Sequence, residues 1–127
     1  MRPLTIEARP WPEIAAFYRG IPWAGAMADL AERIAASEYA PGLFGATSMH
    51  TLLVAQTPEF ERDAGVLRVE PVVESTEPPK LRLRFEFVEQ PGVERRWTRE
   101  CAPEEGFATF LRFLQLQRWF VEYRPAR

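Results

Sequence analysis

The stretch Leu81–Glu89, LRLRFEFVE, alternates apolar and charged side chains over most of its length. Its apolar positions are Leu81, Leu83, Phe85 and Phe87, and the charged positions between them are Arg82, Arg84 and Glu86. A period of two places the first set on one face of a β-strand and the second set on the other. The alternation therefore predicts a strand of an antiparallel sheet with one buried face and one face in water.

The segment that follows predicts a hairpin whose register depends on its turn. The sequence QPGV at 90–93 has the proline and glycine of a type II turn, which would lead into a strand at Val93–Glu100. A two-residue loop would set Glu86 opposite Trp97 and turn that indole toward water. A one-residue bulge in the turn would swap the faces, and we expect this bulge, with Trp97 facing inward.

Three segments before residue 81 also read as strands. Alternation predicts a short strand at Leu4–Ala8, which Pro10 would end. A mostly apolar run predicts a second strand at Ser48–Gln56, and Val66–Glu74 predicts a third. Pro71 cannot donate to a sheet ladder, so its presence in the third strand indicates an edge position or a bulge.

Helices are predicted on both sides of the strand-rich region. Pro12 suits the first position of a helix at Glu13–Arg19. A second helix, from about Pro22 to Tyr39, has one apolar stripe, formed by Trp23, Met27, Leu30 and Ile34. A long final helix begins at Pro103 and runs to about Tyr123.

The predicted order is β-α-α-β-β-β-β-α, which is an α+β arrangement. We expect an antiparallel sheet of about four to five strands, with N-terminal helices and a long C-terminal helix packed on one face. The length of 127 residues fits a single domain, residues 1–127.

Charge and hydropathy exclude several classes of protein. The chain has 16 basic and 18 acidic residues, so the positive charge typical of nucleic-acid binders is missing. No window approaches 18 uncharged apolar residues, and the N-terminus does not resemble a secretory signal. Cys101 is the only cysteine, so no internal disulfide can form. We expect a soluble protein in the cytoplasm, bound neither to a membrane nor to nucleic acid.

The groups that usually carry catalysis are scarce. His50 is the only histidine, and one histidine with one cysteine cannot form a zinc site. We interpret His50 as an ordinary strand residue and Cys101 as a partly buried structural residue, because neighbouring glutamates oppose a thiolate. We therefore predict neither catalytic residues, nor a metal, nor a cofactor. An enzyme that uses carboxylates alone, such as Glu70 or Glu86, is the least favoured alternative.

The final helix has more apolar surface than one covered face requires. One stripe consists of Phe107, Phe110, Leu111, Leu114 and Val121. A second stripe, roughly opposite, consists of Phe113, Leu116 and Phe120, with Trp119 and Tyr123 beside it. The second stripe has three explanations: cover by N-terminal aromatic residues (Trp11, Phe17 and Tyr18), a protein interface, or a ligand cavity.

The surplus stripe and the lack of catalytic groups together predict a non-enzymatic binding protein. We expect it to act through the C-terminal helix and neighbouring aromatic residues, as a homo-oligomer or as a stoichiometric partner or inhibitor of another protein. The predicted binding residues are Phe113, Leu116, Trp119, Phe120 and Tyr123. The alternative is a carrier of a small apolar ligand, with a cavity between the sheet and the C-terminal helix.

Overall fold

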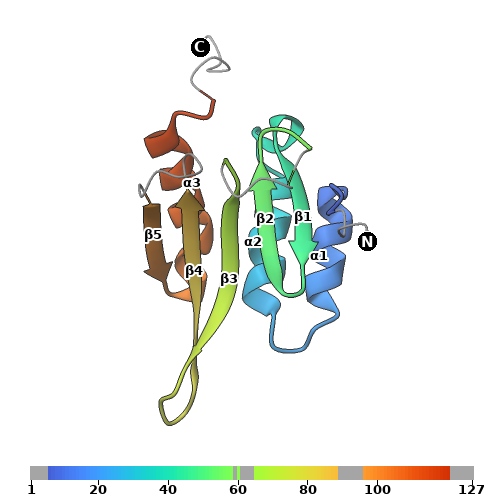
Figure 1. The fold of residues 1–127 in the computed structure, drawn as a ribbon. Helices are drawn as coiled ribbons and strands as arrows, with labels where there is room; N and C mark the ends of the chain where they lie inside the picture. The colour runs from blue at the N-terminus through green and yellow to red at the C-terminus, as the bar shows by residue number, and fades with distance from the viewer. Residues whose placement is uncertain (1–5, 59, 61–64, 89–95, 121–127) are drawn as a thin grey trace, which may run out of the picture.

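The computed structural model describes residues 6–58, 60, 65–88 and 96–120. Within these residues, five strands form one antiparallel sheet in the order β1-β2-β3-β4-β5 (Figure 1). The strands are β1 (Phe44–Ser48), β2 (Thr51–Ala55), β3 (Leu67–Glu74), β4 (Lys80–Val88) and β5 (Arg96–Cys101). The helices are α1 (Trp11–Arg19), α2 (Gly25–Ala35) and α3 (Gly106–Gln117), with short 3-10 turns η1 (Ala40–Gly42) and η2 (Pro103–Glu105). The predicted α+β class is confirmed.

All three helices cover the same face of the sheet (Figure 1). The main core lies between them and that face, and its largest fully buried side chains include Tyr18, Met27, Leu52, Phe85 and Phe110. A smaller apolar cluster lies on the opposite face, formed by Ala46, Leu53, Ala55, Phe60 and Val66. The β1–β2 end of the sheet is thus covered on both faces.

The strand predicted at Leu81–Glu89 is β4, and its alternation is confirmed. Leu83, Phe85 and Phe87 point into the main core, whereas the charged residues between them lie on the other face. The predicted inward orientation of Trp97 is also confirmed, because Phe87 pairs with Trp97 and not with Arg96. This register is one residue away from that of a simple two-residue loop, although the turn itself lies outside the described residues.

The single strand predicted at Ser48–Gln56 is wrong, because this region contains a hairpin. β1 and β2 are joined by Met49 and His50, with Ser48 paired to Thr51. β1 begins four residues earlier than expected, and its glycine lets α1 approach closely. A Cβ atom on Gly45 would lie 2.7 Å from Ile14 Cδ1 and 2.8 Å from the Trp11 ring.

The N-terminal strand predicted at Leu4–Ala8 is not found in its described part, residues 6–8. Among the described residues before α1, only Arg9 pairs with the sheet, through an isolated bridge in which its N–H donates to the Gly45 carbonyl at 2.9 Å. Ile6 instead packs on the smaller apolar cluster. The observed order of elements is therefore α-α-β-β-β-β-β-α.

Several helix boundaries also differ from the prediction. α1 begins at Trp11, α2 ends at Ala35 and not near Tyr39, and α3 begins at Gly106, after the 3-10 turn that contains Pro103. α2 begins at Gly25, not near Pro22, so Trp23 precedes the helix and is 48% exposed rather than buried. α3 ends at Gln117, because Arg118 adopts a left-handed conformation with φ 57°. The predicted end near Tyr123 was therefore too late, and residues 121–127 lie outside the described part of the chain.

Pro71 lies at a local edge of the sheet, as predicted. β2 pairs with β3 only over Leu67–Val69, so the following part of β3 has β4 as its single neighbour among the described strands. The missing N–H of Pro71 therefore breaks no ladder on the side facing β2. The paired ends of β3 and β4 project beyond the rest of the sheet (Figure 1).

Candidate functional site

The five predicted binding residues do not form one surface. Phe113 is fully buried, and its ring lies 5.0 Å from Phe87, 5.2 Å from Trp97 and 5.0 Å from Trp119, measured between ring centroids. The rings that surround Phe113 thus come from β4, β5 and the end of α3. The N-terminal aromatic residues lie elsewhere: Trp11 donates its indole N–H to the Leu43 carbonyl at 3.2 Å. Phe113 is a core residue.

The remaining predicted residues lie at the end of α3. Leu116 is 49% exposed, and Trp119 and Phe120 are half-buried. The Gln56 side-chain amide donates to the Trp119 carbonyl at 2.6 Å, and the Phe120 ring lies 5.0 Å from Tyr39. These contacts attach the end of α3 to β2 and η1. Tyr123 lies outside the described residues.

A second apolar surface, which we call the Trp23 patch, consists of Trp23, Met49 and His50. The rings of Trp23 and His50 meet edge to face at a centroid distance of 4.8 Å. Met49 is 85% exposed and occupies the β1–β2 turn with φ 56°. Figure 1 shows this turn and the α1–α2 connection at the same end of the molecule, away from the end of α3.

Tyr18 lies beneath the Trp23 patch and holds its turn in place. This side chain is fully buried in α1, and its hydroxyl donates to the His50 carbonyl at 3.0 Å. Burial raises the pKa of the Tyr18 phenol, so the hydroxyl stays a hydrogen-bond donor at neutral pH. The turn therefore presents Met49 and His50 from a fixed backbone. His50 is exposed in a turn, not in the strand where the sequence placed it.

No sequence pattern predicts the Trp23 patch as a unit. Its two exposed apolar residues were assigned to regular elements, Trp23 to a helix stripe and Met49 to a strand. Their exposure follows from the late start of α2 and from the two-residue turn. Methionine is uncommon in turns, so residue types alone do not predict a turn at Met49.

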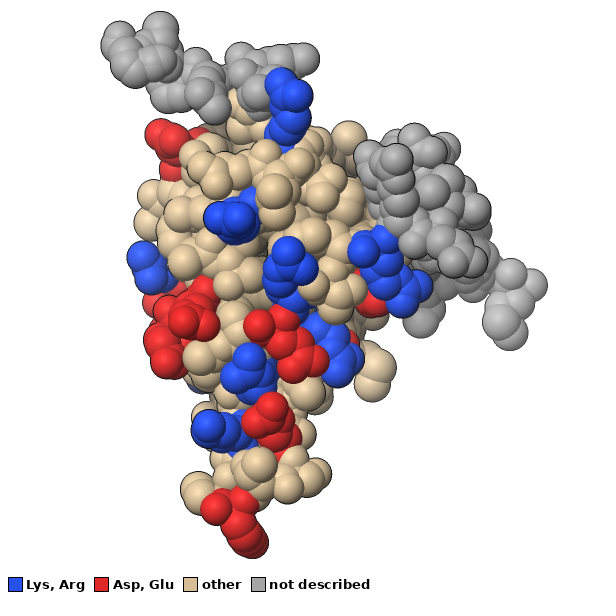
Figure 2. Space-filling view, turned by 90° about the vertical axis from the view of Figure 1, so that its left-hand side faces the viewer, with Lys and Arg blue, Asp and Glu red and all other residues tan. Residues whose placement is uncertain are grey.

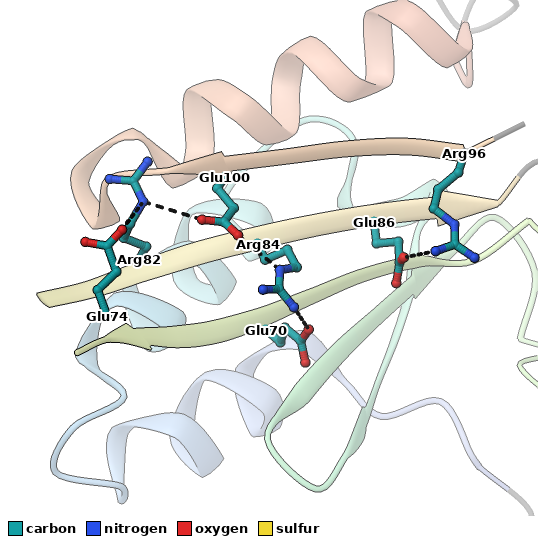
Figure 3. A network of polar contacts seen from close by, with 7 residues as sticks. All are labelled: Glu70, Glu74, Arg82, Arg84, Glu86, Arg96 and Glu100. Carbon is teal, nitrogen blue, oxygen red and sulfur yellow. Dashed lines mark hydrogen bonds and ion pairs between the residues drawn. The ribbon is translucent and has the colours of Figure 1, made fainter.

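The outer face of β3, β4 and β5 carries a network of ion pairs (Figure 3). Arg84 contacts Glu70 and Glu100, each at 3.2 Å. Arg82 lies 3.7 Å from Glu100 and 3.8 Å from Glu74, and Arg96 lies 3.0 Å from Glu86. Seen from the β5 side of the molecule, acidic and basic side chains lie interspersed near the sheet (Figure 2).

The carboxylates considered for an enzyme belong to this network. Glu70 and Glu86 each face an arginine on a half-exposed sheet surface. Charged groups in such a setting are solvated and paired, which is unlike the desolvated environment that sets apart a catalytic acid and base. The network is more readily explained as cross-strand pairing that solvates the face.

The thiol of Cys101 is poorly suited to nucleophilic chemistry. Its side chain is buried, and this burial raises the thiol pKa. A hydrogen bond with Thr109 acts in the opposite direction, and Glu105 raises the pKa further. The thiol is therefore protonated at neutral pH, as expected for a structural cysteine.

The described grooves lie on the helix layer. One, of about 780 Å³, runs between α1 and α2 and is lined largely by alanine side chains. Another, of about 320 Å³, lies between α2 and the start of α3, with Asp29, Glu32 and Glu104 among its lining residues. Arg19 binds the first two carboxylates at 3.0 and 2.8 Å, and both are more than half exposed.

The space between the sheet and α3 is filled by aromatic side chains. Phe85, Phe110 and Phe113 are fully buried there, and the Phe87 ring packs on Phe113. A ligand carried between these layers would have to displace this packing. The geometry therefore does not favour the carrier alternative.

Metal binding and membrane insertion find no support in the described part of the chain. The residues with assigned positions include no group of three or more His, Cys, Asp or Glu side chains that could hold a metal. The helices that the structure describes are all too short or too polar to cross a membrane. Neither a family model, nor a curated protein, nor a solved structure matches this chain.

Proposed function

We propose that this protein is a non-enzymatic interaction protein that binds an apolar surface of another protein. The observation that carries the proposal is Met49, a large apolar side chain that is 85% exposed in a left-handed backbone conformation. That conformation costs a non-glycine residue about 1 kcal/mol, and the exposed side chain buries little surface in return. Contact with a partner would supply the missing burial.

The composition of the Trp23 patch supports this function. Tryptophan is enriched among the residues that dominate binding energy at protein interfaces, and methionine adapts its shape to different apolar surfaces. Trp23 is 48% exposed directly beside the turn that carries Met49. Because Tyr18 fixes this turn, little conformational entropy would be lost on binding.

The end of α3 is the second contact surface that we propose. Leu116, Trp119 and Phe120 supply it, and the buried Phe113 supports Trp119 from the core. We extend this surface to Tyr123 on the strength of the sequence alone. We also propose that the protein acts in the cytoplasm. A single, buried, free cysteine is consistent with that reducing compartment.

Site-specific photo-crosslinking in the cells that naturally make the protein tests this function. A photoreactive amino acid would replace Met49 in one variant, Leu116 in a second, and the exposed Glu38 in a control. We expect one defined protein adduct at Met49 or Leu116 and none at Glu38. The Met49 adduct should disappear when Trp23→Ser is added. Crosslinks at Met49 and Leu116 no stronger than the Glu38 background would refute the proposal.

A further inference from the structure

The outer edge of β5 is open in the described part of the chain. β5 is the last strand of the sheet and pairs only with β4, over Arg96–Cys101. Figure 1 shows it at the left margin of the sheet, with no described strand beyond it. Such an edge presents backbone N–H and C=O groups that can pair with another strand. At Thr98 the carbonyl accepts a hydrogen bond from the Arg99 guanidinium at 2.9 Å, so a strand that pairs there must share this carbonyl with Arg99 or displace its side chain.

We propose that β5 pairs antiparallel with β5 of a second copy of this chain, about a two-fold axis at Thr98. The pairing would join the two sheets into one continuous sheet with the helices of both copies on the same face. This inference does not rest on the proposed function, because it uses neither the Trp23 patch nor the end of α3.

The sequence of β5 is complementary to itself about Thr98. In this register Arg96 lies opposite Glu100 of the second copy, and Glu100 lies opposite Arg96 of the second copy. Thr98 faces its own equivalent. Opposite charges and threonine pairs at directly opposed positions both stabilise antiparallel strands.

Every other two-fold register over the central residues of β5 is worse. An axis at Arg96 or at Arg99 would oppose two arginines, and an axis at Glu100 would oppose two glutamates. An axis at Trp97 would leave Arg96 facing Thr98 and form no ion pair. The charges on this edge therefore favour one register of self-pairing.

The ion pairs on the outer face extend across the sheet from β3 through β4 to β5, the strand that forms this edge. Along one row of the sheet, Glu70 pairs with Arg84 and Arg84 pairs with Glu100, each at 3.2 Å (Figure 3). Arg96 of the second copy would be the next residue in that row, which gives strictly alternating charges across the junction. Arg96 has the exposure this requires, since 61% of its side chain is accessible.

The helix-side face of β5 fits the same axis. Trp97 and Arg99 both point to that side, and the Arg99 guanidinium lies 5.3 Å from the Trp97 ring within one chain. In the proposed register each Trp97 lies opposite Arg99 of the second copy. A cation–π contact could therefore form across the axis as well as within each chain.

Charge reversal tests the register. Arg96→Glu would place two glutamates opposite each other, and Glu100→Arg would place two arginines opposite each other. We expect sedimentation analysis to show a reversible wild-type dimer of the 14.7 kDa chain, and each single variant to raise its dissociation constant by about tenfold or more.

Mixing the two variants should restore a one-to-one dimer, because their charges are then complementary. Arg112→Glu and Glu38→Arg, exposed reversals outside β5, are the controls and should dimerise like the wild type.

A crosslink provides a second measurement that does not depend on the stability of the reversal variants. Thr98→Cys in a Cys101→Ala background should form a disulfide-linked dimer under mild oxidation, whereas Glu38→Cys in the same background should not. A wild type that stays monomeric at the highest soluble concentration overturns the proposal. So does a folded pair of reversal variants that fails to recombine, or a Thr98→Cys variant that crosslinks no better than Glu38→Cys.

Discussion

At the scale of the residue, Met49 combines a strained backbone with an exposed apolar side chain. Glycine adopts a positive φ without a Cβ clash, so Met49→Gly should relieve the strain while losing little burial. We expect the free energy of unfolding to rise by about 1 kcal/mol. Urea denaturation at neutral pH measures this change directly.

Arg118 gives a matched comparison, because it ends α3 with a φ of 57°. Arg118→Gly should stabilise the protein by a similar amount, since glycine is the preferred residue at a helix C-terminus of this kind. If Arg118→Gly stabilises the protein but Met49→Gly destabilises it, the Met49 side chain makes an intramolecular contact that outweighs its strain. The exposed Met49 side chain would then be explained without a partner.

At the scale of the element, α3 has one covered side and one open side. Phe113 is fully buried among rings, so Phe113→Ala should lower the free energy of unfolding by about 3–5 kcal/mol. Leu116 is about half exposed, and Leu116→Ala should cost less than about 1 kcal/mol. Chemical denaturation of both variants tests this difference; equal losses would mean that the two side chains are covered alike.

The side of α3 that would be buried could not be decided from its own sequence. Both apolar stripes have helical spacing, and periodicity alone does not predict that the buried side takes Phe110 and Leu114 from one stripe and Phe113 from the other. The answer depends on Trp97, whose inward orientation follows from a register shift of one residue in the β4–β5 hairpin. Once Trp97 faces inward, Phe113 joins the core.

The β4 strand and the class of the fold were predictable, because charges and apolar residues alternate there over a long stretch. The β1–β2 hairpin was not, because its turn consists of Met49 and His50 and its first strand contains Gly45 and Ala46. Such residues produce neither a turn signal nor an apolar alternation. The Trp23 patch depends on this hairpin, so it was missed for the same reason.

At the scale of the whole molecule, the fold separates two apolar surfaces. The Trp23 patch lies at the end where α1 meets α2, and the residues of the α3 surface lie at the other end of the helix layer (Figure 1). On the other side of the sheet, the outer face of β3, β4 and β5 carries paired charges. Two partners could therefore bind at opposite ends of the helix layer at the same time.

The stability of the whole molecule should fall at alkaline pH. Burial raises the pKa of both the Tyr18 phenol and the Cys101 thiol, so the folded protein keeps these two protons when the unfolded chain has lost them. In an unfolded chain the pKa of cysteine is about 8.5 and that of tyrosine is about 10. Between about pH 7 and the first value these two groups leave the free energy of unfolding unchanged; above that value it should fall, with a limiting slope of about 1.4 kcal/mol per pH unit for each group.

Two substitutions separate the contributions to this alkaline decline. Tyr18→Phe should cost about 1 kcal/mol at neutral pH, because the His50 carbonyl loses a hydrogen bond, but stability should then fall less steeply above about pH 10. Cys101→Ala should remove the decline that begins near about pH 8.5. The other phenols, Tyr39 and Tyr123, and the single lysine, Lys80, are present in the wild type and in both variants, so they cancel in the comparison, and the arginines keep their charge throughout this range. Urea denaturation between pH 7 and 11 gives the slopes. If the free energy of unfolding of Tyr18→Phe falls as steeply as that of the wild type above about pH 10, the Tyr18 phenol does not control stability in that range. Such a result would contradict the burial of this phenol beneath the β1–β2 turn.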